Sequence, residues 1–101
     1  MKQTYQMYFG RNVPTGEYVT DELWNGFREV LNMTFSGYTI QDVEGAWKGE
    51  SEATKLVTVT TKYRDKVNDV CKAYVNLFNQ DAVGLLVSEP MTFVTKEVEV
   101  F

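Results

Sequence analysis

The chain has 101 residues, is 44% hydrophobic and 24% charged, and carries a formal net charge of −4, which is typical of one folded domain and unlike a disordered segment. It contains no histidine and one cysteine, so an intramolecular disulfide is excluded and we expect neither a metal site nor a cofactor. Its Lys and Arg residues form no cluster, which predicts no nucleic-acid partner. It has no apolar run of about 18 residues, which predicts no membrane partner.

The first half of the chain predicts a strand, a loop and a helix. Residues 3–9 alternate in polarity around Tyr5, which indicates a strand. Residues 10–19 contain glycine and proline and indicate a loop. Thr20 is placed to cap a helix whose first turn is acidic. The apolar residues of this helix recur at helical spacing, at Leu23, Trp24, Phe27, Val30 and Leu31.

The second half of the chain predicts further strands around a second helix. Residues 38–47 and 55–62 are predicted strands, joined by a loop rich in Gly, Ser and Glu. Asp65 begins a helix with an apolar stripe. Residues 83–87 form a mostly apolar strand, and the strict alternation at residues 97–100 indicates a short extra strand.

This order of elements predicts an α+β protein with a ferredoxin-like fold, β-α-β-β-α-β, in which two helices cover one face of an antiparallel four-stranded sheet. We expect it to form a single domain over residues 1–101. The second face of such a sheet is bare, and 14% of the residues are aromatic. We therefore expect an apolar sheet face that is buried in a homo-oligomer, a dimer or a trimer.

The sequence also favours a cytoplasmic protein. Residues 1–5 contain no apolar segment of the kind found in secretory signals. The single cysteine, Cys71, fits a reducing compartment. It lies on the apolar stripe of the second helix, where we expect an unreactive buried thiol.

The most informative segment is residues 45–55, which places Trp47, Glu50 and Glu52 in a loop that enters a central strand. A soluble domain does not need this combination in order to fold. One interpretation is a solvated acidic loop beside a core or interface aromatic. The other is a binding site, in which the carboxylates face a cationic ligand and the ring of Trp47 stacks on an adenine or a sulfonium. We take Glu52 as the catalytic carboxylate, and Trp47 and Glu50 as ligand-binding residues.

Three further residues are candidates for the same site. Arg11 follows the first strand, where it is either a strand-end residue or a bidentate partner of a ligand carboxylate or a second subunit. Tyr8 and Tyr38 are the phenols closest to the site in strand order. We assign Tyr38 a catalytic role and Tyr8 a ligand-binding role.

Two stretches resemble a small bacterial family known only as a domain of unknown function, and together they cover about two-thirds of the chain. The first stretch begins with Tyr8-Phe9-Gly10-Arg11 and continues through Pro14, Gly16, Val19, Trp24 and Phe27. The second consists of Gly45-Ala46-Trp47 and Glu52-Ala53-Thr54-Lys55-Leu56-Val57. The resemblance implies a ferredoxin-like fold and no established chemistry.

More distantly, the chain is similar to the phage enzymes that degrade S-adenosylmethionine as lyases. The matching residues are Gly45-Ala46-Trp47, Glu50, Glu52, Asp65-Lys66 and Gln80-Asp81. This resemblance implies an oligomer with sites between subunits, where a tyrosine and a glutamate lie near the sulfonium. In this chain Trp47 stands where the family has its tyrosine, and Glu52 lies about two residues from the aligned position.

We therefore expect a site for an adenosine-type small molecule near Trp47 and Glu52. The leading hypothesis is cleavage of S-adenosylmethionine to methylthioadenosine and homoserine lactone, in which Glu52 polarises or deprotonates the substrate and the substrate's own carboxylate displaces the thioether. The alternative is a non-catalytic module that sequesters a nucleotide or inhibits a host protein. The lack of histidine and the presence of Trp47 at the tyrosine position favour this alternative.

Overall fold

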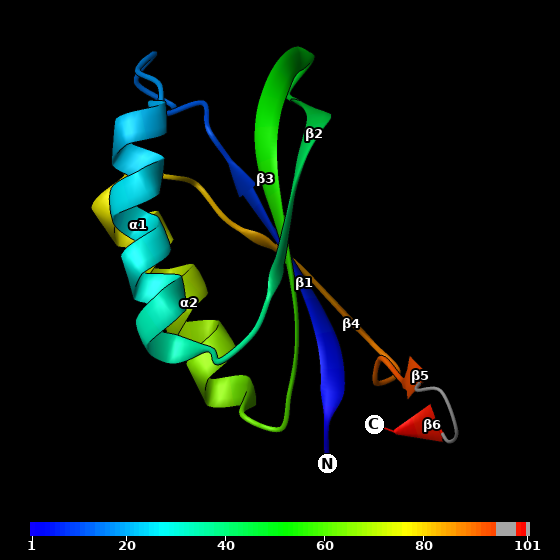
Figure 1. Cartoon of the computed structure of the whole chain (residues 1–101). Coiled ribbons are helices and arrows are strands. Elements are labelled where there is room, and N and C mark those ends of the chain that lie inside the picture. The colour runs from blue at the N-terminus through cyan, green and yellow to red at the C-terminus, as the bar shows by residue number, and fades with distance from the viewer. Residues whose placement is uncertain (95–98, 101) are drawn as a thin grey trace.

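Four strands form one antiparallel sheet, and two helices lie together against one of its faces (Figure 1). The computed structural model describes residues 1–94 and 99–100, without the side chains of Trp47, Phe93, Glu99 and Val100. The elements are β1 (Gln3–Gly10), α1 (Asp21–Thr34), β2 (Thr39–Trp47), β3 (Glu50–Thr61), α2 (Arg64–Leu77), β4 (Gly84–Ser88), β5 (Phe93–Val94) and β6 (Glu99–Val100). The strand order β2-β3-β1-β4 confirms the predicted ferredoxin-like α+β fold.

The core lies between the sheet and the helices, and strand alternation builds it. Tyr5, Met7 and Phe9 of β1 are buried, whereas the residues between them face the other side of the sheet. The side chains that the helices bury are Trp24, Phe27 and Leu31 from α1, and Val67, Val70 and Tyr74 from α2. The predicted N-cap is confirmed, because the Leu23 amide donates to the Thr20 hydroxyl at 3.2 Å.

An aromatic cluster occupies the centre of this core. The ring centroid of Phe9 lies 4.8 Å from that of Tyr74 and 5.5 Å from that of Phe27. The aromatic residues thus concentrate in the core rather than on the open sheet face, where Gln6 and Thr58 pair. Tyr8 and Leu56 pair on the same open face, which is therefore of mixed polarity, and burial of this face in a dimer or trimer stays a prediction.

The segment expected to be a loop between the second and third strands is a tight hairpin. Lys48 and Gly49 have φ values of 52° and 81°, as in a two-residue type I′ turn. Trp47 pairs with Glu50, and Gly45 pairs with Glu52, so β3 starts five residues earlier than predicted. Gly, Ser and Glu are poor strand formers, but the pairing with β2 overrides that preference and places both glutamates on a strand.

The remaining elements are short. The backbone of β5 pairs with that of β6, which agrees with the predicted extra strand at Glu99 and Val100, whereas residues 97 and 98 lie outside the described residues. Among the described helices, none is both long and apolar enough to cross a bilayer.

Two side chains of α2 predict a loss of stability in alkaline solution. Burial raises the pKa of the Cys71 thiol to about 11. Burial also raises the pKa of the Tyr74 phenol; Arg11 opposes this shift, and Glu52 and Tyr18 add to it. In the unfolded chain these groups titrate near their ordinary values, about 8.5 and about 10. Their contribution to the free energy of unfolding is therefore complete below about pH 8 and falls as the pH rises above that value, because the unfolded chain loses the protons first.

Urea titrations at pH 7 and pH 10.5 test this expectation. The Cys71→Ala, Tyr74→Phe double variant should show a smaller loss between the two pH values than the wild-type chain. An equal loss in both proteins would assign the alkaline sensitivity to other groups.

Candidate functional site

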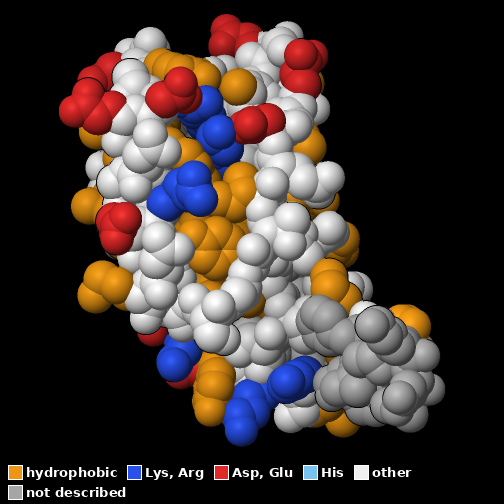
Figure 2. All heavy atoms as spheres, in the orientation of Figure 1, with side chains coloured by type: hydrophobic (Ala, Val, Ile, Leu, Met, Phe, Trp, Pro, Cys, Tyr) orange, Lys and Arg blue, Asp and Glu red, His pale blue; other side chains and the backbone are white. Residues whose placement is uncertain are grey.

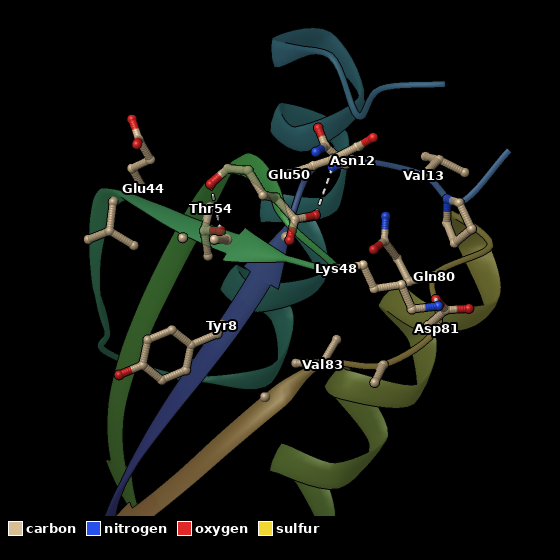
Figure 3. Close-up of a pocket in the computed structure, with 18 of the residues that line it drawn as sticks. Tyr8, Asn12, Val13, Glu44, Lys48, Glu50, Thr54, Gln80, Asp81 and Val83 are labelled. Carbon is tan, nitrogen blue, oxygen red and sulfur yellow. Dashed lines mark hydrogen bonds and ion pairs between the residues drawn. The ribbon is translucent and has the colours of Figure 1, made fainter. Parts of the chain in front are cut away.

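A cavity of about 680 Å³ opens at the end of the sheet where β1 and β2 finish and β3 and β4 begin. Pockets for small molecules typically measure about 300–1,000 Å³. The β2–β3 hairpin forms one wall, and the loops that follow β1 and α2 form the other. Figure 3 shows Lys48, Gln80 and Asp81 together on one side of the cavity, with Tyr8 on the strand that crosses its floor.

Three glycines, one each on β1, β2 and β4, create the hollow. Gly10 pairs with Thr54, Gly45 with Glu52, and Gly84 with Tyr8. By strand alternation all three positions face away from the helices. Because none of them carries a side chain, the open face of the sheet is sunken there, and backbone forms part of the cavity floor.

The carboxylate of Glu52 is held in this hollow by two features of β1. Its Oε2 accepts a hydrogen bond from the backbone amide of Asn12 at 3.0 Å. A Cβ atom at Gly10 would lie 2.5 Å from the same Oε2, so only glycine leaves room for the carboxylate. Glu52 is therefore a half-buried acid in a fixed position rather than a mobile surface residue.

The backbone that supports Glu52 is itself anchored to the core. The Tyr74 hydroxyl, at the centre of the aromatic cluster, donates to the carbonyl oxygen of Gly10 at 2.8 Å. The amide of Arg11 donates to the carbonyl of Ala53 at 3.0 Å. Residues 10–12 are thus tied to α2 and to β3 directly beneath the cavity.

The cavity is acidic. Four acidic residues are among those that line it, Glu44, Glu50, Glu52 and Asp81, although the carboxylate of Glu44 points away from the cavity (Figure 3). Lys48 is the one cationic residue among the described lining residues, and its Nζ lies 3.5 Å from Oδ2 of Asp81. Acidic side chains also gather on the surface at the end of the molecule that carries the hairpin and the start of α1 (Figure 2). This charge favours a cationic ligand.

The structure brings three of the predicted site residues together. Glu50, Glu52 and Tyr8 line the cavity, and Tyr8 is 37% exposed. The side chain of Trp47 lies outside the described part of the structure.

Tyr38 directly precedes β2, whereas Glu52 of β3 pairs near the other end of β2. Tyr38 precedes Gly45, the strand partner of Glu52, by seven residues, about 23 Å of extended chain. Its hydroxyl bonds to Oδ1 of Asn32. The structure does not bring the predicted catalytic residues Tyr38 and Glu52 together, because they lie at opposite ends of the β2–β3 hairpin. Tyr8 is the phenol of the cavity.

Arg11 serves the fold rather than the cavity. Its Nε donates to the Val19 carbonyl at 2.8 Å, and Nη2 donates to Oδ1 of Asp21 at 2.7 Å. The guanidinium also lies 4.7 Å from the centroid of the Tyr18 ring. These contacts fasten the loop after β1 to the start of α1, and Arg11 is absent from the described lining.

Several lining residues have no signal of their own in the sequence. Asn12, Thr54 and Lys48 are ordinary strand-end and turn residues that only the tertiary fold brings to the cavity. Gln80 and Asp81 had a signal only through the lyase resemblance. The Nε2 atom of Gln80 is buried and lacks a hydrogen-bond partner among the described residues.

Within residues 1–94 and 99–100, no group of three Cys, His, Asp or Glu side chains is placed to hold a metal ion.

Fold and site together define a ferredoxin-like α+β protein with a cavity of about 680 Å³ at one end of its sheet. The chain belongs to the family described as "Protein of unknown function (DUF3574)", whose model matches residues 4–93. This confirms the resemblance to a family without known chemistry. No curated protein matches the chain.

Proposed function

We propose that the cavity binds a small organic cation of the S-adenosylmethionine type, with the sulfonium beside Glu52. The observation that carries the proposal is the position of the Glu52 carboxylate over Gly10, in a cavity where Lys48 is the one cationic residue of the described lining. The Asn12 amide holds one carboxylate oxygen, so little reorganisation is needed when a cation arrives. The volume of about 680 Å³ suits a ligand of nucleoside size.

Comparison of two ligands that differ in charge at sulfur tests this proposal. S-adenosylmethionine carries a sulfonium, whereas S-adenosylhomocysteine carries a neutral thioether. Calorimetry should show tighter binding of the sulfonium, and Glu52→Gln should remove about tenfold of that preference, which corresponds to about 1.4 kcal/mol. Glu22→Gln makes the same change on the exposed surface of α1 and should leave the preference intact. Equal affinity of the wild-type chain for both ligands would refute the proposal.

The same site supports cleavage of the bound sulfonium as the catalytic form of the proposal. The ligand's carboxylate oxygen attacks its own Cγ, the Cγ–S bond breaks, and the electron pair stays on sulfur. The products are methylthioadenosine and homoserine lactone, and no proton, oxidant or water is required. The role of Glu52 is to hold and orient the sulfonium.

A non-catalytic module that sequesters a nucleotide or inhibits a host protein is the second candidate. The separation of Tyr38 from Glu52 along β2 favours it, because the lyase resemblance implies a tyrosine beside the glutamate. Chromatography of S-adenosylmethionine incubated with the protein for hours separates the two. Methylthioadenosine above the buffer control supports the lyase, and binding without product supports the module.

A further inference from the structure

The charges in the cavity are unevenly placed. Glu44, Glu50 and Glu52 belong to the strands of the β2–β3 hairpin. Lys48 occupies the turn of that hairpin and points to the opposite wall, where it lies beside Gln80 and Asp81 (Figure 3). The backbone of Lys48 lies three residues beyond Gly45, the strand partner of Glu52, about 10 Å along the strand. Glu52 and the Lys48–Asp81 ion pair therefore lie on different walls of one cavity.

The partner that Lys48 has in the structure is easily exchanged. The Lys48–Asp81 pair spans 3.5 Å, and its side chains are 74% and 49% exposed. Exposed ion pairs of this kind contribute only about 0.2–1 kcal/mol. A ligand carboxylate that reaches Lys48 can replace Asp81 at little cost.

We propose that Lys48 binds the carboxylate of the ligand, so that the cavity selects zwitterions that carry an amino-acid group over ligands that are only cationic. This inference rests on the proposed function, because Glu52 supplies the site for the cationic centre. A ligand carboxylate is repelled by Glu50 and Glu52, and Lys48 is the one cationic residue of the described lining. Asp81 competes with the ligand for Lys48 and so limits the affinity for zwitterions.

S-adenosylmethionine and its decarboxylated analogue test the proposal, since both carry the sulfonium and only the first carries the carboxylate. The quantity to measure by calorimetry is the ratio of the two dissociation constants. Lys48→Met should lower the preference for S-adenosylmethionine about fivefold. S-adenosylmethionine loses the ion pair between its carboxylate and Lys48, and the decarboxylated analogue is no longer repelled by the Lys48 charge. Asp81→Asn should change the ratio in the opposite direction, about twofold, because Lys48 is freed.

Matched variants separate this effect from a change in the fold. Lys48→Arg keeps the charge in the same turn and should retain the preference. Lys2→Met and Asp69→Asn make the same charge changes outside the cavity lining and should leave the ratio unchanged. If Lys48→Met weakens both ligands equally, the carboxylate assignment is overturned and the sulfonium site stands. If the wild-type chain binds neither ligand, both proposals are overturned.

Discussion

The Phe27→Ala variant should have a free energy of unfolding about 3–5 kcal/mol below that of the wild-type chain. Phe27 is 2% exposed. Its ring lies between those of Phe9, Trp24, Tyr74 and Phe78, at centroid distances of 5.5, 5.8, 5.1 and 6.0 Å. Truncation removes the ring from the middle of the aromatic cluster and leaves a cavity between sheet and helices. Domains of this size are stable by only about 5–15 kcal/mol, so the variant loses a large part of its stability.

Urea unfolding followed by circular dichroism measures this loss. Met33→Ala is the matched control on the same helix, because Met33 is 87% exposed and its truncation should cost less than about 0.5 kcal/mol. Similar losses in the two variants would contradict the assignment of Phe27 to the core.

Gly10→Ala should lower the affinity for S-adenosylmethionine about tenfold, a loss of the size expected for Glu52→Gln, which corresponds to about 1.4 kcal/mol. The added Cβ would lie 2.5–2.7 Å from the carboxyl atoms of Glu52, so the carboxylate must leave its position over β1. The Asn12 amide then loses its partner, and the sulfonium loses the acid that faces it.

Gly45→Ala is the control for this prediction, because it makes the same substitution in the same hollow. Its Cβ would meet Oγ1 of Thr54 at 3.7 Å and the Glu52 carbonyl oxygen at 4.0 Å, which are ordinary contacts. Calorimetry should therefore show near wild-type binding for Gly45→Ala. If both alanine variants lose affinity alike, the position of Glu52 is not what the ligand requires.

The order of elements could be predicted from the sequence because the periodicity is strong. Alternation around Tyr5 and the helical spacing of Trp24, Phe27 and Leu31 each match what the structure buries. The start of β3 could not be predicted, since Glu50 and Ser51 have low strand propensity and join the sheet only through pairing with β2. Gly49 in the Lys48-Gly49 turn is typical of a two-residue hairpin connection. The neighbouring Gly, Ser and Glu residues nevertheless make the whole segment look like a loop.

The candidate site could be predicted only in part, because its residues are brought together by tertiary contacts. Glu52 and Tyr8, which line the cavity, can be predicted because an acid near a central strand and a phenol on the first strand are unusual in a soluble domain. Tyr38 was misplaced because strand order does not say which end of a long strand meets the site. Arg11 was assigned to a ligand because sequence gives no sign that Val19 and Asp21 occupy its guanidinium.

The hydrogen bond from Tyr74 to the Gly10 carbonyl couples the proposed ligand site to the packing of the core. A phenol at the centre of the aromatic cluster fixes the strand residue on which Glu52 rests. Repacking of α2 that shifts this ring therefore shifts the acid as well, even when the chain stays folded. In a library of variants selected for ligand binding, substitutions at Tyr74 should be depleted together with those at Gly10 and Glu52, although the Tyr74 side chain is completely buried. Under the proposed function, substitutions that move the Tyr74 ring beneath the cavity should therefore change ligand affinity.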